Sequence, residues 1–477
     1  MNLNKKPRLF ILTSGLVAFF TITSTAYAHG FGERYDLPMP LLYFIIGAIV
    51  AVGLSFLLVG IFVTNEASLR SLRFEIPLPN WLKGHIGTRY ISWIIKCFSV
   101  LLLALILITT LIGSNKPIYN FSPTFIWIIW WVGLGFVSAV LGNVWPFINP
   151  WKITFEFAST ISKVFTNKEM FKPILNYPVD LKGWPAVILF AVFAWIENVY
   201  WGAAIPRHLA VLVIVFSLIQ WGGMLLFGKQ IWLKIGDPFN QIFRFFSKLS
   251  IFEINYLERK VFIRPPGFGF LSSSKLDVST MIFVLILLST VTFDGIKETP
   301  FCANLHSTLP ALSYTQIDTL GLIIVPAIFI SIYLIFCFSI RYFSRENSNL
   351  IFIGISFAFS LLPIALAYHF AHYLSLLLIP GQAIIPLLSD PFGIGWNLFG
   401  SADYQIRLTA INAKAAWFFS VFVIVIGHVL AVYVSHVMAL KLFKSHSNAI
   451  RSQYPMLLLM LIYTAISLWI LSMPIIE

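Results

Sequence analysis

The sequence contains few charged residues. Asp, Glu, Lys and Arg make up 11% of its 477 residues, whereas 58% are hydrophobic and the mean hydropathy is +0.86. This composition excludes an ordinary soluble globular domain and indicates a polytopic membrane protein. Because most basic residues lie in loops between apolar runs, the net charge of +13 indicates membrane topology rather than nucleic-acid binding.

Cysteine is also scarce, and two of the three cysteines, Cys97 and Cys337, lie inside apolar runs. We therefore expect no disulfide framework. Two enzyme motifs are missing as well. The segment 223–229 matches the start of a phosphate-binding loop, but Gln230 replaces the required Ser or Thr. There is no G-x-S-x-G elbow of a serine hydrolase.

Residues 1–28 have the pattern of a signal peptide. Basic residues precede an apolar core, and an A-x-A cleavage site ends at Ala28. The alternative is an uncleaved first membrane helix. Cleavage would leave His29 at the mature N-terminus, where its amine and imidazole nitrogens can chelate copper. Alternatively, His29 binds no metal and is simply the residue that follows the cleavage site.

Ten further apolar runs are long enough to cross a bilayer, which takes about 20 residues. They predict an all-α polytopic membrane protein, with residues 29–477 forming a single helical domain. The predicted spans are 40–63, 91–113, 124–142, 183–201, 208–228, 276–294, 319–341, 350–378, 415–440 and 453–472.

Lys and Arg are distributed unevenly between alternate loops. One set of loops holds 22 of the 32 basic residues, and the segments on the other side hold six. The positive-inside rule places the first set in the cytoplasm and the mature N-terminus outside. We therefore expect a multi-pass protein of the bacterial inner membrane. The predicted cytoplasmic loops are 64–90, 143–182, 229–275, 341–349 and 441–452.

The loop 229–275 contains a basic, Phe-rich stretch from Phe239 to Phe252. Its amphipathic pattern predicts a helix lying on the anionic inner leaflet. The longest outer connection is the loop 379–414, in which turn residues alternate with aromatic ones. Such a loop suits a lid or the floor of a site.

Histidines in apolar runs are the main candidates for chemistry, because ionisable side chains at membrane depth usually face a cavity or a partner. His369 and His372 are three residues apart and share one helix face. His428 lies at a comparable depth on the next antiparallel helix. With Asp294 and His29, these three histidines are predicted ligands of a divalent transition metal, copper or zinc.

Two alternatives stand beside this metal site. The histidines can instead form hydrogen bonds between helices, or His369 and His428 can hold a haem. His436 is excluded from a shared site, because it lies about 12 Å along the helix axis from His428. In the outer loop, Asp390 and Asp403 are candidates for a general base, and the alternative is that both are simply solvated.

Several segments resemble bacterial polytopic membrane proteins known as fenitrothion hydrolases. The likeness covers nearly the whole mature chain. Asn397 departs from the pattern, because members of that family carry an acidic residue there. The segments that carry the resemblance are His29–Pro38, Thr292–Gly295, Ser389–Tyr404, Gly427–Val429 and Arg451–Met456.

The resemblance implies an inner-membrane enzyme that hydrolyses the P–O–aryl bond of organophosphorus triesters. A lipophilic substrate would enter from the bilayer, and a metal held by the histidines would activate water in a cavity facing the periplasm. The alternative is a membrane protein that handles copper or another transition metal. A haem-bearing electron carrier is a third hypothesis. The expected partners are lipid and a small lipophilic substrate or metal ion.

Overall fold

The computed structural model describes residues 37–63, 73–77, 85–166, 171–255, 260–271, 277–344, 349–443 and 445–473. The predicted signal peptide and His29 lie outside these residues. Ten described helical segments are long and apolar enough to cross a membrane, which confirms the predicted all-α polytopic fold. Their bounds agree with the predicted spans to within a few residues, except that the tenth begins at His446 and not near residue 453.

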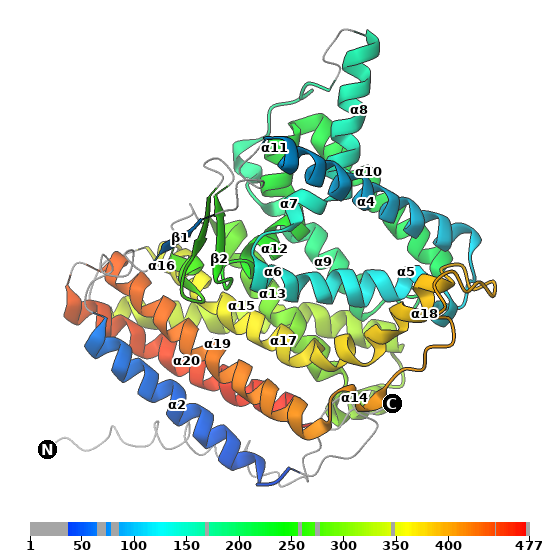
Figure 1. Ribbon diagram of the computed structural model, residues 1–477. Coiled ribbons are helices and arrows are strands. Elements are labelled where there is room, and N and C mark those ends of the chain that lie inside the picture. Colours follow the sequence, from blue (N-terminus) through cyan, green and yellow to red (C-terminus); the bar gives the residue numbers. More distant parts are fainter. Residues whose placement is uncertain are drawn as a thin grey trace, which may run out of the picture.

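Seven spans are single helices, and three are built from consecutive shorter ones (Figure 1). The single helices are α2 (Leu41–Phe62), α4 (His85–Ile112), α10 (Pro206–Phe227), α13 (Val278–Lys297), α15 (Tyr314–Ser344), α19 (Ala413–Leu442) and α20 (His446–Ser472). The third span comprises α5 (Phe121–Thr124), η3 (Phe125–Gly133) and α6 (Leu134–Leu141). The fourth comprises η4 (Val179–Leu181) and α9 (Trp184–Asn198), and the eighth comprises α16 (Leu350–Ala358), η7 (Phe359–Leu361) and α17 (Leu362–Leu378).

Shorter helices occupy the connections. They are η2 (Pro117–Tyr119), α7 (Trp145–Ile148), α8 (Pro150–Thr166), α11 (Lys229–Ile231), η5 (Trp232–Gly236), α12 (Pro238–Phe246), η6 (Phe268–Leu271), α14 (Pro300–Thr308), η8 (Pro380–Ala383), α18 (Ile384–Ser389) and η9 (Leu408–Ala410).

The third and eighth spans change helix type without a break, and a proline accounts for the change in the eighth. The eighth span passes from α16 through η7 into α17, which has Pro363 in its first turn. Proline has no backbone N–H, so the α-helical hydrogen-bond ladder is interrupted there. The third span contains the nine-residue π-helix η3, and such segments are frequent at functional sites.

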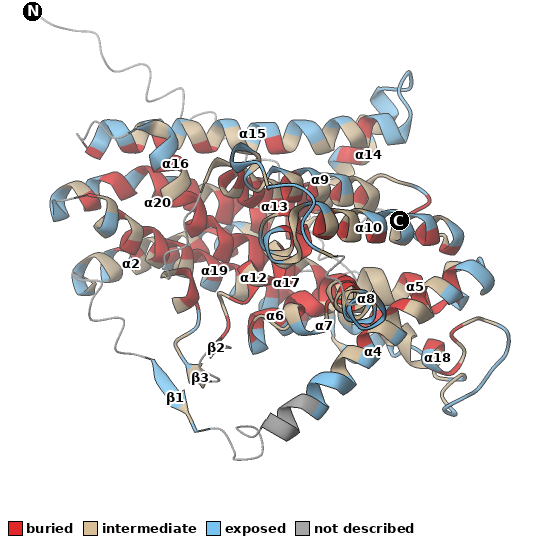
Figure 2. Ribbon diagram, turned by 90° about the horizontal axis from the view of Figure 1, so that it is seen from above, coloured by how far each residue is buried: buried red, intermediate tan, exposed pale blue. Residues whose placement is uncertain are grey.

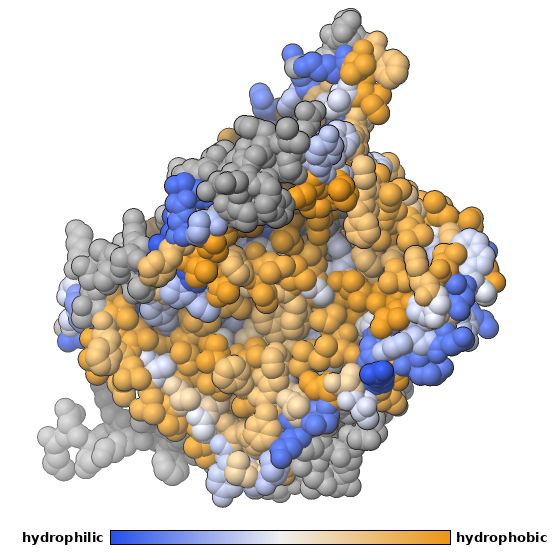
Figure 3. Space-filling model, viewed as in Figure 1, coloured by the Kyte–Doolittle hydropathy of each residue, from blue (hydrophilic) through white to orange (hydrophobic). Residues whose placement is uncertain are grey.

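The centre of the bundle is formed by α13, α17, α19 and α20. Buried residues concentrate on these helices, whereas α15 lies at the edge with much of its surface exposed (Figure 2). The molecular surface seen in Figure 3 is largely hydrophobic, and hydrophilic residues lie mainly towards its margins. A surface of this kind is what a lipid-embedded bundle requires.

α17 and α19 pack closely at Gly427. A Cβ atom built there would lie 2.3 Å from Cβ of Ala367 and 2.8 Å from the carbonyl oxygen of Pro363. A residue without a side chain is therefore needed at this crossing. The glycine sets the distance between the helices that carry His372 and His428.

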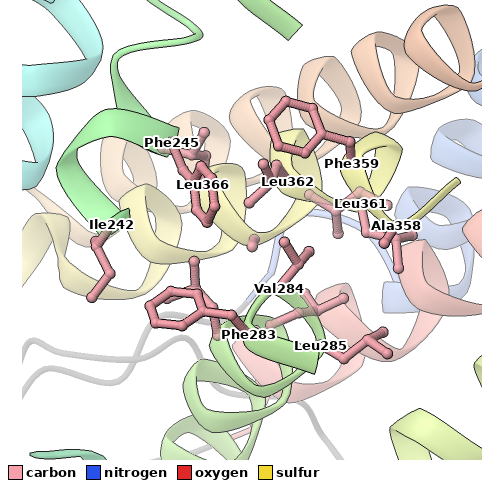
Figure 4. Packing of buried hydrophobic residues seen from close by; sticks show 14 of the residues in the cluster. Ile242, Phe245, Phe283, Val284, Leu285, Ala358, Phe359, Leu361, Leu362 and Leu366 are labelled. Atoms are coloured by element: carbon pink, nitrogen blue, oxygen red, sulfur yellow. The ribbon is translucent and has the colours of Figure 1, made fainter. Parts of the chain in front are cut away.

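Helix α12 is buried inside the bundle, which corrects the expectation that the Phe-rich stretch lies on a membrane surface. Figure 4 shows Ile242 and Phe245 packed with side chains of α13 and α17. Asp237 caps the helix by accepting a hydrogen bond from the backbone N–H of Phe239 at 3.0 Å. The amphipathic pattern is present, but its apolar face is covered by protein. The buried side chains are Pro238, Phe239, Ile242, Phe243, Phe245 and Phe246.

A small antiparallel sheet joins two loops that are far apart in the sequence. It consists of β1 (Phe74–Ile76), β3 (Lys260–Ile263) and β2 (Phe252–Asn255), in that order. Arg73 pairs with Glu253 across the sheet at 2.7 Å. The pairing places the described strand of the loop 64–90 and the two described strands of the loop 229–275 on the same side of the bundle, in agreement with the alternation that the basic residues predict.

The close packing of α17 and α19 at Gly427 can be tested by measuring the stability of a variant. We expect Gly427→Ala to lower the free energy of unfolding by about 1–3 kcal/mol, because the added methyl group has no space. Thermal unfolding of the purified chain in detergent measures this change. Gly222→Ala is the matched control, since no atom lies within 4 Å of a Cβ built there. Equal melting temperatures for Gly427→Ala and wild type would contradict the packing.

Candidate functional site

The structure brings together two predicted site residues, His372 of α17 and Asp294 of α13. The Nε2 atom of His372 lies 2.9 Å from Oδ2 of Asp294. An ionised carboxylate only accepts hydrogen bonds, so Nε2 carries the hydrogen and donates it. In the neutral ring, this tautomer leaves a lone pair on Nδ1. The contact therefore has the arrangement of an acid that orients a base.

Two further donors surround the Asp294 carboxylate. The Tyr373 hydroxyl donates to Oδ2 at 2.8 Å, and Lys297 Nζ lies 3.4 Å from Oδ1. The Asp294 side chain is only 14% exposed. A carboxylate withdrawn from water is costly unless it is paired and hydrogen-bonded. Donors from α17 and from its own helix meet that requirement.

A second acidic residue, Glu197 of α9, is joined to the same network. Trp131 of η3 donates its indole N–H to Glu197 Oε1 at 2.5 Å, and the Tyr373 hydroxyl lies 3.5 Å from that oxygen. Lys297 also donates to the backbone oxygen of Asn198 at 3.3 Å. The polar network therefore connects four spans.

Sequence reasoning did not assign four members of this network, which are Trp131, Glu197, Lys297 and Tyr373. An acidic residue inside an apolar run is a signal that could have found Glu197, because such groups are rarely left without partners. No comparable signal distinguishes Trp131 or Tyr373 from the many other aromatic residues of the chain. Only the folded arrangement identifies them.

His372 and Asp294 line a pocket of about 300 Å³ between the ends of α13, α17, α19 and α20. Most of its wall is apolar, and Tyr373 and Glu298 add polar groups. This combination of an apolar wall with a few converging polar groups is typical of small-molecule sites. The apolar residues are Ala371, Leu376, Pro380, Ala413, Ala416, Trp417 and Leu471.

His369 lies in a different environment from His372. Its ring is fully buried, with centroids 4.8 Å from the Tyr373 ring, 5.1 Å from Phe246 and 5.7 Å from Trp131. Gly135 gives it room, because a Cβ there would lie 3.0 Å from His369 Nε2. This ring is not part of the pocket wall.

His428 is also apart from the pocket. It is buried on α19, where its Nδ1–H donates to the backbone oxygen of Ile424 at 2.8 Å. In the described part of the chain, His369, His372, His428 and Asp294 do not form a group of three ligand atoms within 4.8 Å of one another. The predicted ligand set is thus represented by the His372–Asp294 pair alone, and His29 lies outside the described residues.

His436 has a bridging position away from this pocket. Its Nε2 donates to the backbone oxygen of Val63 at 2.7 Å, and its Nδ1 lies 2.9 Å from Gln453 Oε1. These contacts join α19 to α20 and to the end of α2. The separation of His436 from the other histidines agrees with the spacing argument from the sequence.

The two aspartates of the outer loop are outside the pocket wall. Asp390 accepts hydrogen bonds from the backbone N–H groups of Ile394 at 3.1 Å and Gly395 at 2.7 Å, so its carboxylate shapes the turn. Asp403 is exposed. The loop folds against the turn between α4 and α5, where Phe392 accepts a hydrogen bond from the Ser114 backbone at 2.8 Å. Only the two ends of the loop, near Pro380 and Ala413, reach the pocket.

Comparisons of the chain with protein-family models, curated proteins and solved structures found no match.

The Tyr373 hydroxyl links the two acidic residues, so removing it should weaken the bundle. We expect Tyr373→Phe to lower the free energy of unfolding by about 1.5–3 kcal/mol, the range for a hydrogen bond to a charged group. Tyr43→Phe is the matched control, because Tyr43 is 61% exposed, and its change should stay within about 0.5 kcal/mol. Thermal unfolding in detergent measures both, and equal effects of the two substitutions would argue against the network.

Proposed function

We propose that the pocket beside His372 hydrolyses the P–O–aryl bond of lipophilic organophosphorus triesters, with His372 as the general base. The observation that carries this proposal is the 2.9 Å contact between His372 and Asp294 at the wall of a mostly apolar pocket. The resemblance of the sequence to fenitrothion hydrolases supplies the reaction class.

His372 has the groups that a general base needs. Asp294 accepts the hydrogen on Nε2 and so fixes the tautomer in which Nδ1 can take a proton from water. Tyr373 and Lys297 hold the carboxylate in place. The developing imidazolium is stabilised by the negative charge of Asp294, as in acid–base pairs of other hydrolytic enzymes.

The reaction balances with water as the only co-substrate. Water oxygen attacks phosphorus as one of its protons passes to Nδ1 of His372. A new P–O bond forms and the P–O–aryl bond breaks, so the bonding electrons leave with the aryl oxygen. The proton on His372 is then released to the aryloxide or to solvent, and the products are a diester acid and a phenol.

The wall of the pocket suits such a substrate. An aryl phosphotriester is neutral and lipophilic, so it partitions into the bilayer and needs apolar contacts rather than a charged site. Trp417, Leu376 and Leu471 offer these contacts around His372. The pocket lies at the end of the bundle that the basic loops predict to face the periplasm.

A metal-activated water is the second form of this proposal. His372 and Asp294 offer two neighbouring ligand atoms, an imidazole nitrogen and a carboxylate oxygen, which suit zinc or copper. His29 is a further predicted ligand. When bound, the ion would lower the pKa of its water and polarise the phosphoryl oxygen.

Turnover of an aryl dialkyl phosphotriester with a chromophoric phenol tests the proposal. The full chain is reconstituted in lipid vesicles, and phenol release is followed. His372→Gln and Asp294→Asn should lower kcat/KM by roughly 100- to 10,000-fold, the usual contribution of a general base. His208→Gln is the matched control, because His208 also has a polar partner, Tyr200 at 2.9 Å, but lies outside the pocket wall.

The outcomes separate the hypotheses. Wild-type rates in His372→Gln and Asp294→Asn, or no hydrolysis by the wild-type chain, would contradict the proposal. Loss of hydrolysis on chelation and recovery with zinc or copper would select the metal-activated form. Metal binding that is lost in His372→Gln, in a chain that shows no hydrolysis, would favour the metal-handling alternative.

A further inference from the structure

A second group of chemically reactive side chains lies between α14 and α15. The Cys302 thiol, a His306 ring nitrogen and an Asp318 carboxylate oxygen all lie within 4.8 Å of one another. This is the only such trio of Cys, His, Asp or Glu groups in the described part of the chain. It shares no residue with the pocket of His372.

Local structure places the three side chains together. Cys302 and His306 are four residues apart on α14, so they project from the same helix face. Asp318 lies near the start of α15, and its Oδ1 is 3.1 Å from His306 Nε2. Ring contact with Tyr314, at 4.4 Å between centroids, further orients the His306 imidazole.

The start of α15 is fixed by a reciprocal cap. The backbone N–H of Ser313 donates to Gln316 Oε1 at 2.8 Å, and the backbone N–H of Gln316 donates to the Ser313 hydroxyl at 3.3 Å. This capping box satisfies helix-terminal donors that have no partner within the helix. It holds Asp318 in position one turn further along.

The donor set suits one class of ion. Thiolate sulfur, imidazole nitrogen and carboxylate oxygen are the three ligand types of protein-bound zinc, and sites with three protein ligands keep a fourth position for water or another group. The trio is largely shielded from solvent: Cys302 is 5% exposed, and the side chains of His306 and Asp318 are 11% and 16% exposed. Such shielding strengthens the attraction between ion and ligands.

We propose that Cys302, His306 and Asp318 bind a zinc-type divalent ion that joins α14 to α15. The ion would replace the His306–Asp318 hydrogen bond with direct bonds from both side chains and would recruit the thiolate of Cys302. Binding releases the thiol proton to solvent. The site is independent of the proposed hydrolase, because its ligands lie outside that pocket.

Metal binding by the full chain in detergent is the first test. The chain is stripped with a chelator, dialysed against zinc, and analysed for bound metal. Wild type should retain one zinc equivalent more than Cys302→Ser and His306→Gln. Asp318→Asn should also weaken zinc binding. The loss should exceed the roughly 10- to 100-fold that follows when a residue that only orients a metal ligand is removed. Cobalt should give a thiolate charge-transfer band that Cys302→Ser removes.

Cysteine alkylation gives a second readout that needs no variant. Zinc should slow modification of Cys302 in the wild-type chain and leave modification of the exposed Cys97 unchanged.

Cys97→Ser and His208→Gln are the controls for the metal-binding test and should retain the zinc equivalent. Equal zinc content in Cys302→Ser and wild type, or alkylation of Cys302 that zinc does not slow, would overturn the proposal.

Discussion

Burial of the Asp294 carboxylate is the constraint on which the arrangement of this bundle depends. A carboxylate held away from water needs hydrogen-bond donors, and leaving it unpaired costs several kcal/mol. Its own helix supplies only Lys297, so the remaining donors come from His372 and Tyr373 on α17. Tyr373 then reaches Glu197, which Trp131 also contacts. One buried charge thereby fixes the relative positions of four spans.

The same constraint accounts for the polarity of the pocket. Two of the donors that satisfy Asp294, His372 and Tyr373, belong to the pocket wall, and most of the other wall residues are apolar. Close packing behind the site keeps it in shape: Gly427 lets α19 approach α17, and the buried helix α12 brings Phe246 against the ring of His369. His369 is thus part of the aromatic support behind Tyr373, while His372 is the histidine at the pocket wall.

The membrane spans were predictable because a bilayer imposes a length and a hydropathy on each segment, and both are written in the local sequence. The site was predictable only in part. Residue spacing gives depth along a helix axis, so His369, His372 and His428 were placed at similar levels, but it gives no rotation about that axis. The contact of His372 with Asp294 depends on that rotation. Periodicity likewise identified the apolar face of α12 but could not tell whether lipid or protein covers it.

Attack of water on phosphorus beside His372 can be followed by carrying out the hydrolysis in heavy-oxygen water. Mass spectrometry of the products locates the label. We expect one heavy oxygen in the phosphorus acid, none in the phenol, and loss of labelled product in His372→Gln under conditions where the variant is folded. Label in the phenol would rule out this mechanism. So would the same amount of labelled phosphorus acid from His372→Gln as from the wild-type chain.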